Sequence, residues 1–460
     1  MAVYQPLADQ EASSLYELDR TYWLHPQGDL GAAPGTIPQI AFSHGAGATL
    51  TDIHGREYID ALAALWNVNV GYGREVLADA AAAQMRTLAF SNAYGGFGHE
   101  PAIRLAARLA ELAPGDLETT FFTSGGAEAN ESAFKLARLY WRLKGQPDRV
   151  KIVSRLRGYH GLTYGATSAT GLPVFWKDAG PLAPGFVHVA APDPYRFDPA
   201  GGAATPGAAY AAELESLIVR EGPETVAAVV AEPVQGAGGV IVPPPDYFPL
   251  VRQICDRHGV LLIADEVITG FGRTGRWFAM EHWGVAPDLM VFAKGITSGY
   301  LPLGGVMMTA EVHRTLRAFH GALPHGFTYS GHPTACAVAL RNLRIIEEEE
   351  LVARAEVLGD RLLAKLEGLK AHHQVVGHVR GLGLLAGVEL VRDRATRESF
   401  DPSWGVGRQV FQGMLAEGVI VRALTGDVIA VCPPLVITEE QLDRVVDVLD
   451  RTIGQVAATV

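Results

Sequence analysis

The fold is decided by the stretch Gly259-Val-Leu-Leu-Ile-Ala-Asp265-Glu-Val-Ile-Thr-Gly-Phe-Gly-Arg-Thr-Gly275, which is followed after a short gap by Pro287-Asp-Leu-Met-Val-Phe-Ala-Lys294-Gly. Two short apolar runs, residues 260–264 and 289–293, each end on one charged residue, Asp265 and Lys294. Runs this short and rich in Val, Leu and Ile suit strands that are buried on both faces of a parallel sheet. Because ligands bind at the carboxyl ends of the strands in such sheets, we expect Asp265 and Lys294 side by side at a ligand crevice.

An acid and a lysine in one crevice suit a particular chemistry. An unpaired lysine is costly to bury, and a desolvated lysine with a lowered pKa is a good nucleophile toward aldehydes. Pyridoxal phosphate (PLP) needs such a lysine for its Schiff base and an acid against its pyridine nitrogen. The simpler alternative is that Asp265 and Lys294 only end their strands in solvent, as isolated strand-end lysines commonly do.

The composition is that of a soluble globular protein with more than one domain. The chain has 460 residues, of which 48% are hydrophobic and 19% charged. Its net charge of −12 and the lack of a basic run argue against nucleic acid or an anionic membrane as partner. No apolar run approaches the roughly 18 residues of a membrane span, and residues 1–11 predict no signal peptide. The three cysteines are scattered, so we expect no metal site and a reducing, cytoplasmic setting.

Strand and helix patterns alternate along most of the chain, which predicts a doubly wound α/β sheet. The expected strands lie near residues 120, 152, 228, 262 and 290, with a further one over 302–309. Residues 333–370 have a strongly helical pattern. A second, smaller domain is expected beyond them, with strands over 383–390, 419–421 and 428–431 and helices around 405–417 and 438–455.

The first of these strands leads into a glycine turn and then a helix. The run Thr123-Ser-Gly125-Gly126-Ala127-Glu128 precedes a helical pattern that continues to Leu143. A helix that begins after such a turn offers bare N–H groups and the positive end of its dipole to an anion. An ordinary tight turn between a strand and a helix would have the same sequence pattern.

Other loop and strand-end residues could reach the same crevice. Tyr159 follows the strand near 152 and could stack on a flat ring, and Glu232 ends the strand near 228. Trp66, and Tyr94 and Phe97 in a second glycine-aromatic loop, could wall a pocket. Each has a simpler alternative, as a core aromatic, a turn aromatic or a solvated strand end.

The run Gly270-Phe-Gly272-Arg-Thr-Gly275 matches the dinucleotide fingerprint G-x-G-x-x-G. That fingerprint requires a helix that opens at the third glycine and an acid at the end of the next strand. Here no convincing helical pattern follows, and Asp288 precedes the next strand instead of ending it. A nicotinamide cofactor is therefore disfavoured.

Taken together, these segments resemble the class III aminotransferases. The resemblance is carried by residues 260–267, Lys294-Gly, Ser124-Gly-Gly-Ala-Glu-Ala-Asn, Gly158-Tyr-His-Gly and Glu232-Pro-Val-Gln-Gly, and it extends from about Trp66 to Pro434. It implies a PLP-dependent transferase of fold type I, in which a large domain (61–332) holds a mostly parallel seven-stranded sheet. A small α+β domain would form from both termini (1–60 and 333–460), and the protein would be a homodimer or a tetramer.

The same resemblance implies roles around the cofactor. Lys294 would be the Schiff-base lysine and the proton shuttle, and Asp265 the partner of the pyridinium nitrogen. Val267 would pack on one face of the ring and Tyr159 on the other.

Further positions match the phosphate end of the site. Gly125 and Gly126 correspond to the phosphate turn, where Ala127 replaces a serine that is common in the family. We also expect Glu232 to be one of the cofactor-binding residues. Thr328 resembles the threonine that reaches the phosphate in the neighbouring subunit, so each site would be completed across the dimer.

Two positions separate the subgroups of this family. Ornithine, acetylornithine and 4-aminobutyrate aminotransferases pair a glutamate with an arginine where this chain has Ala237 and Ala430. Their joint absence is coherent, because either charge alone would be buried without a partner. Arg422 instead resembles the mobile arginine of the amine:pyruvate (omega) aminotransferases, which grips a carboxylate and swings out for amines that lack one.

The sequence therefore predicts ping-pong transfer of an amino group from an amine or an omega-amino acid to pyruvate, giving alanine. The expected substrate-binding residues are Trp66, Tyr94, Phe97, Tyr159 and Arg422. One alternative is another class III PLP enzyme: a diamine, 4-aminobutyrate or beta-alanine aminotransferase with another keto acid, or an aminomutase or decarboxylase. The other is a non-catalytic or nicotinamide-binding α/β protein.

Overall fold

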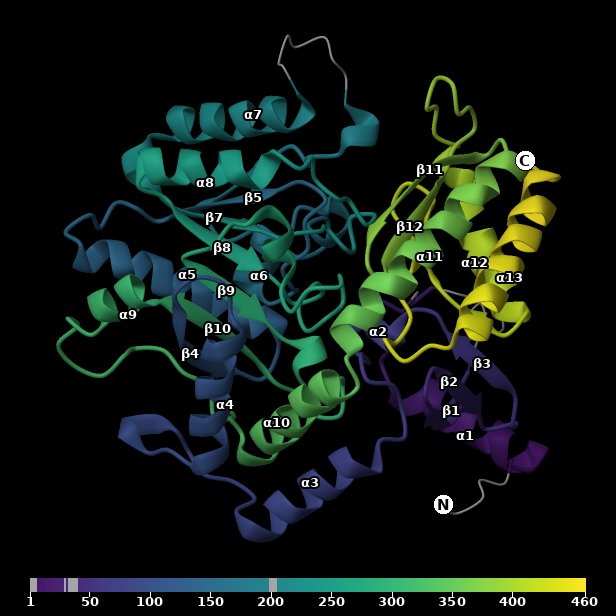
Figure 1. The fold of residues 1–460 in the computed structure, drawn as a ribbon, viewed down its shortest axis with the longest axis horizontal. Coiled ribbons are helices and arrows are strands. Elements are labelled where there is room, and N and C mark those ends of the chain that lie inside the picture. The colour runs from purple at the N-terminus through teal and green to yellow at the C-terminus, as the bar shows by residue number, and fades with distance from the viewer. Residues whose placement is uncertain (1–5, 29, 32–39, 198–204) are drawn as a thin grey trace.

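The structure is a computed structural model that describes residues 6–28, 30–31, 40–197 and 205–460. Two parts lie side by side in Figure 1. The large unit is a seven-stranded sheet with the helices that pack on it, and the small unit comprises two four-stranded sheets and the helices beside them. The first helix, α1 (Asp9–Tyr22), and the C-terminus lie on the side of the small unit.

The seven-stranded sheet confirms the expected α/β architecture. Its only antiparallel strand among the described residues is β10, which runs against both of its neighbours. In sheet order the strands are β4 (Leu117–Thr123), β10 (Gly304–Thr309), β9 (Leu289–Phe292), β8 (Leu261–Asp265), β7 (Val226–Ala231), β5 (Lys151–Arg155) and β6 (Phe186–Val189). The sequence pattern did not predict β6, a short strand at the edge of the sheet with three half-buried residues.

Helices cover both faces of this sheet because its central strands are apolar on both sides. Leu262 and Ala264 of β8 face a core with Phe248 of α8, whereas Ile263 faces a core with Phe134 of α5. This alternation explains why the runs in the sequence are continuous and not periodic. The covering helices are α5 (Gly126–Leu143) and α9 (Ala310–Leu316) on one face and α7 (Pro206–Glu221) and α8 (Tyr247–His258) on the other.

Segments from both ends of the sequence share a sheet in the small unit, because β13 pairs in parallel with β3. One sheet has the order β1 (Phe42–Ala46), β2 (Thr49–Asp52), β3 (Glu57–Asp60), β13 (Val419–Ile420). The other has the order β11 (Val376–Leu382), β12 (Leu385–Leu390), β15 (Val428–Val431), β14 (Arg422–Leu424). Strands β11 and β14 were not among those that the sequence pattern predicted.

Helices complete both units. The helical pattern over residues 333–370 forms two helices, since Glu350 adopts a left-handed conformation (φ 50°) that ends the first and precedes the second. These are α10 (Pro333–Glu348) and α11 (Leu351–His372). The others are α1 (Asp9–Tyr22), α2 (Ala63–Trp66), α3 (Glu75–Thr87), α4 (Glu100–Leu112), α6 (Tyr164–Ala169), α12 (Val406–Ala416) and α13 (Glu439–Ala457). Across the described ranges, none of the helices combines the length and the apolar character that crossing a bilayer requires.

The glycine-rich loop that follows β8 joins the two units instead of opening a helix. The side chain of Arg273 is fully buried and donates hydrogen bonds to the carbonyl of Leu384 (3.1 Å) and to Oδ1 of Asn69 (2.9 Å). Gly383 of the small unit comes so close that a Cβ placed there would lie 2.5 Å from the backbone carbon of Thr274. The glycine-rich loop that resembles the dinucleotide fingerprint thus forms a close contact between the two units.

We expect Gly383→Ala to destabilise the protein by about 2–4 kcal/mol, because it adds a clash with Thr274 to the strain of a positive φ. Gly426→Ala is the matched control, since Gly426 also has a positive φ but has no atom near its missing Cβ. That change should cost about 1 kcal/mol. Urea unfolding midpoints measure the difference, and equal shifts for the two variants would contradict a tight contact between the units.

Candidate active site

Asp265 and Lys294 meet at the carboxyl edge of the large sheet, as the sequence predicted. Asp265 is the last residue of β8, and Lys294 lies just beyond the end of β9. The two strands are parallel neighbours in a register that pairs Asp265 with Val291. Both side chains line one cavity in the molecule.

Five more of the sequence-predicted residues line this cavity. They come from the start of α5, from the loops after β5 and β7, and from the segment after β8. These residues are Gly126, Ala127, Tyr159, Glu232 and Val267. The structure therefore assembles segments that are more than 160 residues apart in the sequence around Asp265 and Lys294.

The N-terminus of α5 forms one end of the cavity. Gly125 is its N-cap and has an extended backbone, and the 18-residue helix begins at Gly126. A Cβ at Gly126 would lie 3.0 Å from the side chain of Val267, so a larger residue would crowd that side chain. Free N–H groups of the first turn and the helix dipole make this end suited to an anion.

Asp265 has two side-chain partners that sequence reasoning missed. Nδ2 of Asn130 donates to its Oδ2 at 2.8 Å, and Nδ1 of His160 lies 2.7 Å from the same oxygen. The backbone N–H of Val267 donates to Oδ1 at 3.1 Å. These three contacts fix the orientation of the carboxylate group. Both residues stand in quoted motifs, but their contact with Asp265 depends on the folded structure.

Lys294 has the electrostatics of a reactive amine. Burial lowers the pKa of its ammonium to about 8, and the negative charges of Asp265 and Glu232 oppose that shift. A substantial fraction of the side chain is therefore neutral at slightly alkaline pH. A neutral lysine amine in a pocket can form an imine with an aldehyde.

Glu232 connects two loops at the cavity wall. Its Oε1 accepts a hydrogen bond from the backbone N–H of Tyr159 (2.9 Å), and its Oε2 accepts one from Gly236 (3.0 Å). Burial raises the pKa of this carboxyl group, and the charge of His160 and the hydrogen bond from Tyr159 act in the opposite direction. The position of Tyr159 therefore depends on the loop that begins at Glu232.

Trp66 lies above Lys294 on a strained turn. The ring centre is 5.2 Å from Nζ of Lys294 and 5.1 Å from Cζ of Arg422, and the side chain is only 3% exposed. Ala64 and Trp66 both have positive φ angles, 55° and 59°. Strain of this kind persists only where the surrounding structure imposes it.

Asp60 holds that strained turn and was also missed from the sequence. Its carboxylate accepts hydrogen bonds from the N–H groups of Leu62 (3.0 Å) and Ala64 (2.6 Å). A third comes from the hydroxyl of Tyr72 at 2.6 Å. Burial raises the pKa of Asp60, and these three donors oppose that shift.

Arg422 brings a positive charge to the ring of Trp66. It lies on β14, and no acidic side chain of the described residues forms an ion pair with it. Burial lowers the pKa of its guanidinium. Ala430 is fully buried in an apolar cluster with Trp66, and Ala237 packs against that cluster. The two alanines thus belong to the apolar surroundings of Trp66.

Three of the predicted site residues lie away from this cavity. Tyr94 and Phe97 are 51% and 68% exposed, and Thr328 is exposed as well. None of them belongs to the described lining of the cavity. A Cβ at Gly326 would lie 2.7 Å from the hydroxyl of Tyr94, so the loop with Tyr94 contacts the segment that leads to Thr328. Exposed apolar side chains of the neighbouring segments include Met85, Leu88, Phe90, Ile103 and Tyr329.

The described residues contain no group of three His, Cys, Asp or Glu side chains arranged to hold a metal ion. The charged side chains that line the cavity are Asp265, Glu232 and Lys294, and they lie with the rings of Tyr159 and His160.

Comparisons with known proteins place the chain in a family. The family model described as Aminotransferase class-III matches residues 31–453. The chain belongs to the class III aminotransferases, and its mostly parallel seven-stranded sheet is that of fold type I. It is an aminotransferase, as the resemblance predicted.

Several relatives are similar over almost their whole length. The chain is 44% identical to the putrescine–pyruvate aminotransferase of Pseudomonas aeruginosa, with 90% of each chain covered. It is 39% identical to the diaminobutyrate–2-oxoglutarate transaminase of Halomonas elongata, with 96% of each covered. The structure of an (S)-enantioselective omega-transaminase from Thermomicrobium roseum superposes with a TM-score of 0.92 at 48% identity, covering 97% of this chain and 99% of that one.

We expect the reaction of Lys294 with a small aldehyde to increase with pH around a midpoint near 8, because burial lowers the pKa of its ammonium to about 8. Reductive methylation of the cofactor-free protein over a pH series, followed by peptide mass spectrometry, measures this. The exposed Lys177 reports the pH dependence of the reagent in the same samples. A midpoint for Lys294 near the ordinary lysine value of about 10.4 would contradict a desolvated amine.

The lowered pKa of Lys294 also makes the folding stability of the cofactor-free protein depend on pH. The pKa of Lys294 is lower in the folded protein than in the unfolded chain. Its charged form therefore destabilises the cofactor-free protein, and the full penalty applies below pH 8. That penalty disappears between about pH 8 and about pH 10.4, where the unfolded chain also loses its proton.

Proposed function

We propose that this protein is a PLP-dependent omega-aminotransferase that moves an amino group from an amine or an omega-amino acid to pyruvate and releases alanine. The observation that carries the proposal is the joint position of Lys294 and Asp265 in one cavity, with the guanidinium of Arg422 close to the lysine. The printed name of the Pseudomonas aeruginosa relative, a putrescine–pyruvate aminotransferase, supports the same pair of substrate classes.

The residues of the cavity fit PLP. The turn at Gly125, Gly126 and Ala127 would hold the phosphate through backbone N–H groups. Asp265, held by two side-chain donors, would face the ring nitrogen, and Val267 and Tyr159 would contact the two faces of the ring. When bound there, PLP supplies an electron sink for the carbon that loses a proton.

The chain itself supplies the proton transfers and the dry environment. Nζ of Lys294 would take the proton from the amine-bearing carbon of the donor, and in the second half-reaction it would deliver a proton to the carbon of pyruvate that becomes the amine-bearing carbon of alanine. Its pKa near 8 suits both steps. Trp66 covers Nζ on the substrate side and excludes water. Asn130 and His160 would hold the carboxylate of Asp265 in a fixed position throughout.

Arg422 would recognise the carboxylate of pyruvate. A guanidinium can bind a carboxylate with two parallel hydrogen bonds, and this one has no acidic partner among the described residues. Ala237 and Ala430 leave that region apolar. The arginine would swing away from Trp66 when an amine without a carboxylate binds.

The complete site would include a second copy of the chain. Thr328 would reach the phosphate of the neighbouring subunit, and Tyr94 and Phe97 would wall its substrate pocket. All three lie on an exposed face that also has apolar side chains, a composition that suits a contact between subunits. We propose a homodimer, or a tetramer built from such dimers.

Lys294→Ala should abolish the absorbance of the bound cofactor in the visible range and all turnover, because no other described lysine lines the cavity. Absorption spectra of the purified protein and alanine formation from pyruvate with a panel of amines measure both effects. A variant that retains the band and the turnover would overturn the proposal. In the unchanged protein, pyruvate consumption that does not match amine consumption would favour an aminomutase or a decarboxylase.

Arg422→Ala should raise KM for pyruvate about 10- to 100-fold, the loss expected for one or two charge-assisted hydrogen bonds. The half-reaction with a simple amine should change little, because that substrate has no carboxylate. Arg392→Ala is the control, since Arg392 is exposed in the same unit. Equal losses in the two half-reactions of the Arg422 variant would contradict carboxylate recognition.

A second candidate function is transfer to 2-oxoglutarate. It is supported by the printed name of the Halomonas elongata relative, a diaminobutyrate–2-oxoglutarate transaminase. A keto-acid panel with one amine donor distinguishes the two, because the amino product is glutamate in one case and alanine in the other.

A further inference from the structure

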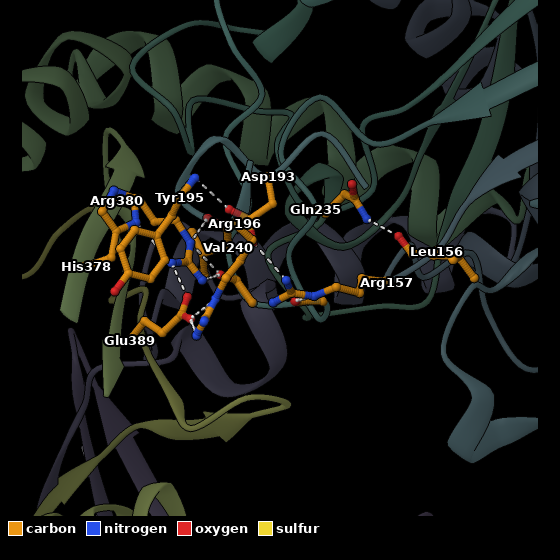
Figure 2. Close-up of polar contacts among 12 residues, drawn as sticks. Leu156, Arg157, Asp193, Tyr195, Arg196, Gln235, Val240, His378, Arg380 and Glu389 are labelled. Carbon is orange, nitrogen blue, oxygen red and sulfur yellow. Dashed lines mark hydrogen bonds and ion pairs between the residues drawn. The ribbon is translucent and has the colours of Figure 1, made fainter. Parts of the chain in front are cut away.

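A buried ion pair lies outside the cavity, and none of the steps above uses it. Nη1 of Arg380 on β11 is 2.6 Å from Oε2 of Glu389 on β12, and the two side chains are only 4% and 3% exposed. Figure 2 shows the pair at the junction of the small unit with loops of the large unit. Burying two charges is costly, so the pair must be compensated by good geometry and further hydrogen bonds.

Those further hydrogen bonds go to a loop of the large unit. Nε of Arg380 donates to the carbonyls of Gly239 (2.9 Å) and Val240 (3.1 Å), and Nη2 donates to Gly239 at 2.6 Å. Val240 has a φ of 52°, which is strained for a β-branched residue. Gly387 of β12 supports the same turn, since a Cβ there would lie 3.0 Å from Cβ of Val240. Arg380 thus holds a strained turn in place.

The held loop begins at Glu232 and is bonded to the loop that carries Tyr159. Nε2 of Gln235 donates to the carbonyl of Leu156 at 3.0 Å. Glu232 accepts hydrogen bonds from the backbone of both loops, at Tyr159 and Gly236. The two loops are therefore connected to each other by several hydrogen bonds.

Arg157 reinforces this connection two residues before Tyr159. Its Nε donates to the carbonyl of Gly238 at 2.8 Å, and its Nη1 lies 2.9 Å from Oδ2 of Asp193. Its own φ is 62°, a second strained conformation in a residue other than glycine. Gly238 packs so closely that a Cβ there would be 1.9 Å from the carbonyl oxygen of Arg157.

Side chains around the ion pair fix it from the outside. Nε of Arg196 donates to Oε1 of Glu389 at 3.0 Å, and the ring of Tyr195 stacks on His378 with 4.5 Å between centres. Nη1 of Arg380 lies 3.2 Å from Nδ1 of His378. Burial and the charge of Arg380 lower the pKa of His378 to about 4, so this histidine is a neutral acceptor at physiological pH.

We propose that the Arg380–Glu389 pair is a positioning clamp that sets the place of the Tyr159 ring from outside the cavity. The order of contacts is Arg380 to the turn at Val240, then to Glu232, then to the backbone of Tyr159. Through it, strands β11 and β12 of the small unit control how tightly the site grips a flat cofactor ring. This inference rests on the proposed function, in which Tyr159 contacts PLP.

Glu389→Gln tests the clamp, because it removes the negative charge and keeps the shape of the side chain. We expect the dissociation constant of PLP from the cofactor-free protein to rise about tenfold, as for the loss of one well-placed hydrogen bond. The visible circular dichroism of the bound cofactor should also fall, because that signal depends on a fixed ring environment. Glu398→Gln is the control, since its ion pair with Arg392 is exposed and in the same unit, and it should change neither quantity.

Arg157→Lys is the second variant, and it tests the same connection if the Glu389 variant does not fold. A lysine can pair with Asp193 but cannot also reach the carbonyl of Gly238 through a second nitrogen. It should weaken PLP binding and lower the dichroism in the same way. A merely structural role predicts a different result for either variant: a lower unfolding temperature with an unchanged dissociation constant and dichroism, which would overturn the clamp.

The unchanged protein separates this inference from the one on which it rests. If it binds no PLP, the proposed function fails. If it binds PLP and the folded variants bind equally well with the same dichroism, only the clamp fails.

Discussion

Two neighbouring buried strands, β8 and β9, end at the same edge of the sheet. The site depends on the two side chains that lie at these strand ends, the acid Asp265 and the amine Lys294. Asn130, His160 and the N–H of Val267 hold the carboxylate of Asp265 in place. Burial lowers the pKa of the Lys294 ammonium to about 8, so its amine is reactive at slightly alkaline pH.

Residues of the small unit also contribute to the surroundings of Lys294. Asp60 at the end of β3 holds the strained turn that places Trp66 over Lys294, and Arg422 on β14 also lies close to that ring, 5.1 Å from its centre. Arg273 binds the two units together from the loop after β8. The cavity itself is lined by residues of the large unit, and Arg422 of the small unit approaches Lys294 through their shared neighbour Trp66. Contacts between the units also allow a change in the small unit to alter how the large unit holds a ligand. The proposed clamp at Arg380 is one such contact.

Continuous apolar runs made the central strands predictable, because a strand buried on both faces needs no other signal. The strands β6, β11 and β14 were missed because edge position or short length leaves little pattern in the sequence. At the site, residues at strand ends and in glycine turns could be predicted, but Asn130, His160 and Asp60 could not be assigned roles. The contacts of Asn130 and His160 join residues 135 and 105 positions apart, which no local pattern encodes. Tyr94, Phe97 and Thr328 lie away from the cavity of their own chain, so their proposed role needs a second subunit.

The central claim is that the amine of Lys294, and no other, forms the covalent link to an aldehyde cofactor. Reduction of the PLP-loaded protein with borohydride, followed by digestion and mass spectrometry of all lysine peptides, tests it most directly. The account predicts one modified peptide, which carries the reduced cofactor on Lys294. A cofactor found on a different lysine, or no modified peptide at all from a protein that is folded and saturated with PLP, would contradict it.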